Sequence, residues 1–202
     1  MPEELNNIRI DDEILVRSCQ RGDLDAMGRL IVKYQDRLYN TLLKICCNPD
    51  DAAELTQETF VKVIESITSF QGKSSFYTWL FRIGVNLTLT FIKRQQKIPM
   101  HSLDAPVNED AESAGNRLAA FLAGREKADP AVLAENREVQ AILMQMLERL
   151  EESQRVVLIL RDIEGMGYQE IAEVLSIELG TVKSRISRAR AGLRNLLQTV
   201  LA

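Results

Sequence analysis

Apolar residues recur at intervals of three and four along most of the chain rather than at every second position. Such intervals place apolar side chains on one face of an α-helix. Gly and Pro are sparse, so few segments are interrupted. The pattern predicts an all-α fold with no sheet, whose first half forms helices at about residues 12–21, 24–46, 51–67 and 78–97.

The pattern changes after Ile98. The segment PMHSLDAPVNEDAESAG is rich in Pro, Ala, Ser and acidic residues and has no apolar period, a composition typical of a linker. The helical period returns after Pro130. The sequence therefore predicts two small helical domains, at residues 1–98 and 129–202, joined by a flexible acidic linker at residues 99–128.

The C-terminal domain contains two amphipathic segments separated by a turn, and apolar residues mark the inner face of each segment. This spacing is that of a helix-turn-helix, whose second helix enters the major groove of DNA. We expect that second helix to begin near Gly180. The apolar positions are Ile171, Ala172 and Leu175 in the first segment, Ile177 and Leu179 in the turn, and Val182, Ile186, Ala189 and Leu193 in the second.

The outer face of the second segment is polar and basic. Arg and Lys there can address guanine edges, Ser can contact several bases, and flanking cations can bind phosphates. The alternative interpretation is a solvated basic helix without a ligand. The candidate base contacts are Lys183, Ser184, Ser187 and Arg188, and the candidate phosphate contacts are Arg185 and Arg190.

Charge is unevenly distributed along the chain, whose formal net charge is −4. Residues 71–103 hold five basic residues and no acidic residue, and the same is true of residues 181–202. The remaining stretches are acidic. Because the bases gather in two acid-free blocks, the sequence predicts two separate contacts with a polyanion in spite of the negative total.

The first basic block overlaps residues 70–91, which hold six of the eleven aromatic residues. Unpaired bases stack on aromatic rings while cations follow the backbone, so this composition suits single-stranded nucleic acid. The loop at residues 71–75 could receive an extruded base. The alternative is that Phe76, Trp79 and Phe81 fill the core. The candidate contacts, including those on a polar stripe of the following helix, are Gln71, Lys73, Ser74, Tyr77, Trp79, Arg82, Asn86, Lys93 and Arg94.

The sequence shows little sign of catalytic or metal chemistry. Cys19, Cys46 and Cys47 have no CxxC spacing, and His101, the single histidine, falls in the linker. We therefore expect no disulfide, metal site or cofactor, and a protein that is not an enzyme. The polar, acidic N-terminus and the lack of a long apolar run predict a cytoplasmic protein without membrane insertion.

Four stretches carry a family resemblance. They are LVRSCQRGDLDAMGRLIVKYQDRLY at residues 15–39, ELTQETFVKV at residues 54–63, SFQGKSSFYTWLFRIGVN at residues 69–86 and LRDIEGMGYQEIAEVLSIELGTVKSRISRAR at residues 160–190. In this order they resemble a bacterial extracytoplasmic-function sigma factor of the sigma-70 family. The resemblance covers both halves of the chain.

The resemblance implies a subunit that binds core RNA polymerase, directs promoter-specific initiation and helps to open the duplex. Its first domain would bind the clamp of the β′ subunit and read the minus-ten element, with Arg82, Asn86 and the loop at residues 71–75. The helix-turn-helix would read the minus-thirty-five element, and the β flap is a second expected contact on core polymerase. A separate anti-sigma factor is a further expected partner. The expected polymerase contacts are Asp51, Glu54, Gln57 and Glu58.

The remaining alternative is a freestanding transcriptional regulator that binds an operator through its helix-turn-helix. That reading explains residues 160–195 but not the aromatic basic block. With both blocks, we expect two promoter contacts held at a distance by a flexible linker.

Overall fold

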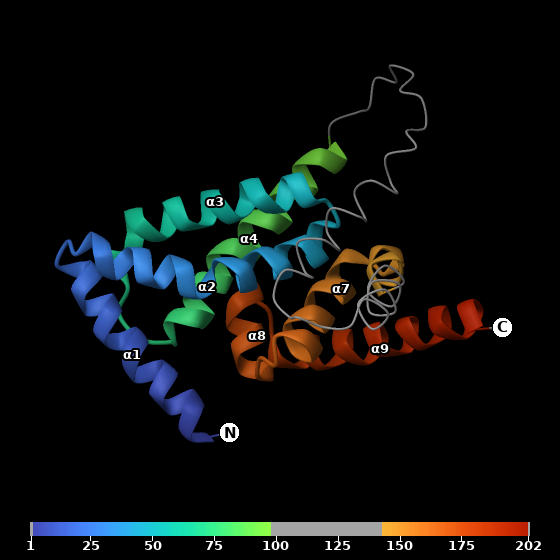
Figure 1. Cartoon of the computed structure of the whole chain (residues 1–202). Coiled ribbons are helices and arrows are strands. Elements are labelled where there is room, and N and C mark those ends of the chain that lie inside the picture. The colour runs from blue at the N-terminus through green and yellow to red at the C-terminus, as the bar shows by residue number, and fades with distance from the viewer. Residues whose placement is uncertain (1, 98–142, 202) are drawn as a thin grey trace, which may run out of the picture.

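The computed structural model describes residues 2–97 and 143–201, and all regular structure in those two ranges is helical (Figure 1). The predicted all-α fold is confirmed for these residues. The predicted linker, the start of the second domain near residue 129, and His101 lie outside them.

The first half forms four α-helices and one 3₁₀ turn. One expected helix, α2, has the predicted limits, whereas α1, α3 and α4 begin earlier than expected. Two caps explain the earlier starts of α3 and α4: the Asn48 side chain accepts the Asp50 and Asp51 amides at 2.9 and 3.1 Å, and Ser75 Oγ accepts the Thr78 amide at 3.1 Å. The elements are α1 (Pro2–Gln20), α2 (Leu24–Cys46), α3 (Pro49–Ser66), η1 (Ile67–Ser69) and α4 (Phe76–Lys97).

These helices pack around a core formed mainly by α2 and α4. Gly84 permits the close approach of α4, because a Cβ atom there would lie 3.0 Å from Leu38 Cδ1 and 3.2 Å from Thr59 Oγ1. A larger residue would have to push these helices apart. The fully buried side chains of this core include Leu30, Leu38, Leu42 and Ile45 on α2, Val63 on α3, and Leu80, Phe81 and Val85 on α4.

The second half contains the predicted helix-turn-helix. Its first helix begins after Gly167, whose amide donates to the Glu170 side chain at 2.8 Å, and its second begins at Leu179, one residue before the expected start. Val174 on the first helix and Val182 and Ala189 on the second are fully buried. The elements are a helical segment at residues 143–149, α7 (Glu152–Leu158), the π-helical turn η2 (Ile159–Ile163), α8 (Tyr168–Leu175) and α9 (Leu179–Leu201).

The two halves are in direct contact. Helix α8 packs against α4, and α7 and η2 pack against α2 (Figure 1). Buried residues of both halves form one continuous hydrophobic cluster. The two halves are therefore in contact in this structure, while the expected spacing between the two DNA contacts, α9 and the loop with α4, stays a prediction. The period of α4 identifies an apolar and a polar side, but it does not say which other helix covers either of them.

Candidate nucleic-acid interface

The outer face of α9 is open to solvent. Lys183, Ser187 and Arg188 are exposed, whereas Val182 and Ile186 on the opposite side are buried. Two other candidates are less accessible: Arg185 is half-buried, and the half-buried Ser184 donates its hydroxyl to the Thr181 carbonyl at 3.0 Å. The α9 face thus has the orientation that its period predicts.

Arg190, a candidate phosphate contact, has an acidic partner within the chain. Its Nε atom lies 3.0 Å from Asp162 Oδ2, and its Nη2 atom contacts the other carboxylate oxygen. A phosphate bound by Arg190 would replace Asp162 in this pair. The sequence does not reveal the pair, because 28 residues separate its members. Arg190 also lines a hollow of about 350 Å³ with Tyr168, Lys183, Ile186, Ser187, Ala191 and Arg194.

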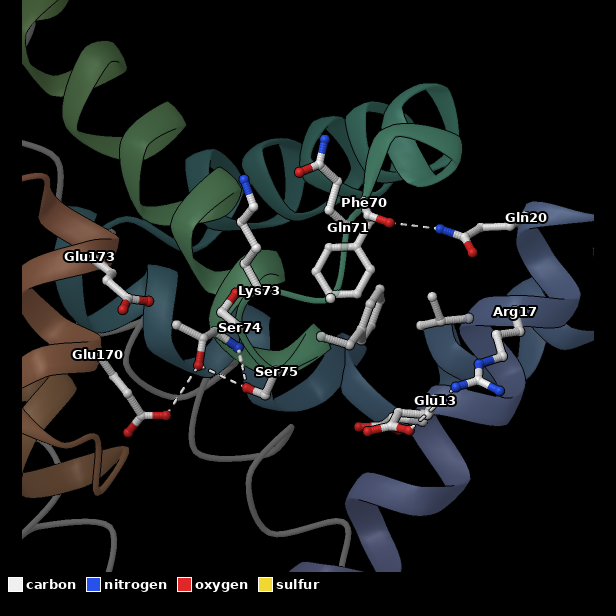
Figure 2. Close-up of a pocket in the computed structure, with 15 residues that line it drawn as sticks. Glu13, Arg17, Gln20, Phe70, Gln71, Lys73, Ser74, Ser75, Glu170 and Glu173 are labelled. Atoms are coloured by element: carbon white, nitrogen blue, oxygen red, sulfur yellow. Dashed lines mark hydrogen bonds and ion pairs between the residues drawn. The ribbon is translucent and has the colours of Figure 1, made fainter.

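A second, larger hollow of about 680 Å³ lies beside the predicted base-receiving loop (Figure 2). Loop residues Gln71 to Ser75 form one wall, α1 forms another with Glu13 and Arg17, and α8 contributes Glu170 and Glu173. The cationic Lys73 and Arg17 thus share this hollow with four carboxylates, those of Asp12, Glu13, Glu170 and Glu173. An incoming nucleic acid would meet the α8 carboxylates unless α8 moved away.

Gln20 holds the loop in place, a role that the sequence did not indicate. Its Nε2 atom donates to the Ile67 carbonyl at 3.1 Å and to the Phe70 carbonyl at 2.8 Å, the bond drawn in Figure 2. Gly72 has φ +68°, a backbone conformation that suits glycine. The fixed carbonyls and the left-handed glycine together define the path of the loop around the hollow.

The aromatic residues of the middle block are divided between core and interface. Phe76 and Phe81 are buried, which agrees with the core interpretation, whereas Trp79 is half-buried. The Trp79 ring packs against Phe70, with centroids 4.9 Å apart, and against Phe76 at 5.9 Å. Trp79 therefore supports the loop as well as offering part of its ring to solvent.

Two predicted DNA contacts of α4 are engaged with the second half of the chain. The Tyr77 hydroxyl donates to Glu164 Oε2 at 2.8 Å, and Asn86 Nδ2 donates to the Val174 carbonyl at 3.2 Å. Burial, followed by the Glu164 charge, raises the pKa of Tyr77 well above its ordinary value, so the phenol remains a neutral donor. The other candidates on this stretch are half-buried at Ser74 and exposed at Gln71, Lys73, Arg82, Lys93 and Arg94.

The predicted polymerase-facing side of α3 is also accessible. Glu54, Gln57 and Glu58 are exposed, and Asp51 is half-buried. Burial, and then the neighbouring Glu54 charge, raises the pKa of Asp51 above its ordinary value. In Figure 1, α3 lies on the side of the first half away from α8, so contacts between the two halves leave this side uncovered.

The described residues contain no group of three His, Cys, Asp or Glu side chains that could hold a metal ion. Cys19, Cys46 and Cys47 are free thiols, and burial raises the pKa of Cys46 to about 11. Within residues 2–97 and 143–201, none of the helices combines the length and hydrophobicity needed to cross a bilayer.

Comparison with known proteins identifies both halves. Residues 30–98 match the family Sigma-70 region 2, and residues 140–193 match Sigma-70, region 4. The chain is 34% identical over 194 residues to the ECF RNA polymerase sigma-E factor of Escherichia coli K12, covering 96% of this chain and 97% of the relative. The chain belongs to the extracytoplasmic-function sigma factors. The sigma-E factor of Haemophilus influenzae is 33% identical over 195 residues, with 96% and 98% of the two chains covered.

Solved structures show the same fold. This sigma factor superposes on CnrH in complex with the cytosolic domain of CnrY with a TM-score of 0.65 and 25% identity, over 94% of this chain and 98% of the other. It superposes on RpoE of Bartonella quintana, in complex with the anti-sigma factor NepR, with a TM-score of 0.61 and 22% identity, over 85% and 96%.

Membership of the family confirms the resemblance predicted from the four motifs. The protein is a promoter-directing sigma factor that binds core RNA polymerase, and its family consists of transcription initiation factors rather than enzymes. The alternative of a freestanding operator-binding regulator accounts for the region 4 match but not for the region 2 match.

Proposed function

We propose that the two halves of this sigma factor read two different promoter elements. Residues 1–98 bind the polymerase clamp and the minus-ten element, residues 129–202 bind the minus-thirty-five element and the β flap, and residues 99–128 connect them. The observation that carries this division is the pair of basic surfaces, one on α9 and one along the loop and α4.

Helix α9 reads the minus-thirty-five element as duplex DNA. Its exposed Lys183, Ser187 and Arg188 present donors on one helical face, as major-groove readout requires. Ser184 lies on the same face. To contact a base, its hydroxyl would break its hydrogen bond to the Thr181 carbonyl and form one to the base. Arg185 and Arg190 bind the flanking phosphates, with Arg190 leaving Asp162 to do so.

The loop and α4 read the minus-ten element as a single strand. An extruded base enters the 680 Å³ hollow beside Gln71, Lys73 and Ser74, and the exposed Arg82, Lys93 and Arg94 follow the strand's phosphates. The half-buried Trp79 ring would stack on a base. Tyr77 and Asn86 would contribute after α8 has left α4, since both are bonded to the second half in the free chain.

The partners follow from the same surfaces. The exposed polar side of α3, with Glu54, Gln57, Glu58 and the half-buried Asp51, faces the polymerase. Two structural neighbours were solved with a bound regulatory chain, CnrY or NepR, which supports an anti-sigma factor as a further partner. The protein acts in the cytoplasm, where core polymerase is found, and requires no cofactor.

Reconstituted transcription tests this proposal. Purified protein added to core RNA polymerase is expected to give specific run-off transcripts from promoters of its own host, with permanganate-reactive thymines in the minus-ten region. A protein that binds duplex DNA tightly but neither associates with core polymerase nor produces a transcript would contradict the proposed function.

A further inference from the structure

A buried carboxylate lies at the centre of the contact between the two halves. Glu164 follows the π-helical turn η2 and has a side chain only 5% exposed. Its amide donates to the Ile159 carbonyl at 3.0 Å, and Gly165, with φ +73°, turns the chain towards α8. The backbone thereby holds the carboxylate beside α2. Single π-turns of this kind often occur at functional positions.

The side chains that bond to this carboxylate come from the first half of the chain. Arg37 Nε lies 2.7 Å and the Tyr77 hydroxyl 2.8 Å from Glu164 Oε2, and Thr41 Oγ1 lies 2.6 Å from Oε1. Arg37 Nη2 also donates to the Glu164 carbonyl at 3.0 Å, and its guanidinium stacks 4.6 Å from the Tyr77 ring centre. In the described residues, these bonds exist only while the two halves remain together.

Two hydrogen bonds extend this contact along α8. Thr78 Oγ1 donates to Glu170 Oε1 at 3.2 Å, and Asn86 donates to the Val174 carbonyl. Each of these bonds joins α4 to α8, so together they hold α8 against the α4 side that the proposed function assigns to unpaired DNA. The same position of α8 places Glu170 and Glu173 at the wall of the base-receiving hollow.

A polar contact of this kind can open and close. Removing a carboxylate from water is costly, and a buried ion pair returns little beyond that cost, whereas separation restores the hydration of every partner. Contacts between domains are accordingly more polar than permanent cores, and here the Glu164 cluster supplies the polar part of a contact that also includes apolar residues of both halves. The Glu164 cluster therefore fixes the geometry of the closed state without making separation of the halves prohibitive.

We infer that Glu164 is a latch that keeps the free sigma factor closed, with α8 covering Tyr77 and Asn86, until core polymerase draws the two halves apart. The inference rests on the proposed function of the α4 surface. The closed state is held by contacts within this chain, so it requires no regulatory partner.

Hydroxyl-radical footprinting of the full chain tests the latch without DNA or polymerase. The readout is oxidation of Tyr77, measured by mass spectrometry. Glu164→Gln is expected to raise the oxidation rate about threefold or more, because the open population increases. The matched control is Glu178→Gln, which makes the same chemical change at an exposed position of the second half and should leave the rate at the wild-type value.

A second pair of variants changes a residue of the first half that bonds to Glu164. Thr41 and Thr59 are both fully buried and both bond to a carbonyl four residues earlier, but only Thr41 also contacts Glu164. Thr41→Val should raise Tyr77 oxidation about twofold, and Thr59→Val should not. If circular dichroism shows that Glu164→Gln has lost helix, the comparison of Thr41→Val with Thr59→Val tests the latch in its place.

The outcomes separate the latch from the proposed function. If wild-type protein drives run-off transcription, yet neither Glu164→Gln nor Thr41→Val changes Tyr77 oxidation relative to its control, the latch is refuted and the function stands. If wild-type protein supports no promoter-specific transcript, the proposed function fails whatever the footprint shows.

Discussion

The two predicted DNA-reading helices differ in what covers their polar sides. The outer side of α9 is exposed, with Lys183 and Arg188 in solvent, whereas on α4 Tyr77 and Asn86 are bonded to the second half of the same chain. Both helices carry the same kind of sequence signal. A basic, amphipathic pattern therefore shows which side of a helix is polar, whereas the accessibility of that side depends on tertiary contacts.

The largest expected effect is on the exposed helix. Arg188→Ala should lower transcription from a promoter of this sigma factor about ten- to a hundredfold, since one good base contact is worth about 1–3 kcal/mol. Run-off assays and upstream footprints of the holoenzyme measure the loss. Gln198→Ala, at an exposed position further along α9, should have little effect, and equal losses in the two variants would argue against base readout by Arg188.

A smaller effect is expected on stability, from glycines that lie where helices pack together within each half. Gly84→Ala should destabilise the first half by about 1–2 kcal/mol, because overpacking outweighs the gain of about 1 kcal/mol from alanine in a helix. Gly192→Ala places its Cβ atom 3.1 Å from Leu150 Cδ2 and 3.8 Å from Gln154 Oε1. Both atoms are tips of side chains that can rotate, so this substitution should be nearly neutral. Denaturant unfolding measures the free energy of unfolding of both variants. A larger decrease for Gly192→Ala than for Gly84→Ala would contradict this prediction.

The covered helix should respond in two opposite ways. Asn86→Ala should slow promoter opening about three- to tenfold through loss of one hydrogen bond to the strand, while the free chain should open more readily because the Val174 contact is gone. Permanganate reactivity measures the first effect and Tyr77 oxidation the second. Loss of upstream contacts with unchanged opening would contradict the assignment of Asn86.

The smallest effect concerns the ion pair beside α9. Asp162→Ala should free Arg190 and strengthen binding to upstream duplex DNA about two- to fivefold at low salt, because exposed ion pairs are weak. The gain should shrink as salt concentration rises. Fluorescence anisotropy of holoenzyme on promoter DNA measures it. A weaker complex would mean that Asp162 positions Arg190 for DNA instead of competing for it.

Sequence periodicity predicted the fold class, the limits of α2 and the helix-turn-helix, because these depend on local apolar spacing. It also predicted that Lys183 and Arg188 would face away from Val182 and Ile186. The Glu164 cluster could not be predicted, since Arg37 and Tyr77 lie 127 and 87 residues away from it in the chain. Glu164 looked like one of many acidic residues, and only the tertiary fold shows its burial.

The Asp162–Arg190 pair and the support of the loop by Gln20 were missed for the same reason. Both join residues of separate elements, across 28 and 50 positions respectively. Trp79 illustrates the reverse case, because the two interpretations of its ring, core and base contact, are both partly satisfied by its half-buried position. Aromatic composition alone could not divide these roles.

Hydroxyl-radical footprinting of the wild-type chain can test whether polymerase uncovers α4, by comparing Tyr77 in the free sigma factor with Tyr77 in the complex with core polymerase. Oxidation is expected to be slow in the free protein and at least about threefold faster in the holoenzyme before promoter DNA is added. Equal oxidation in both states, or faster oxidation in the free protein, would show that α4 is not uncovered by polymerase and would contradict the proposed latch.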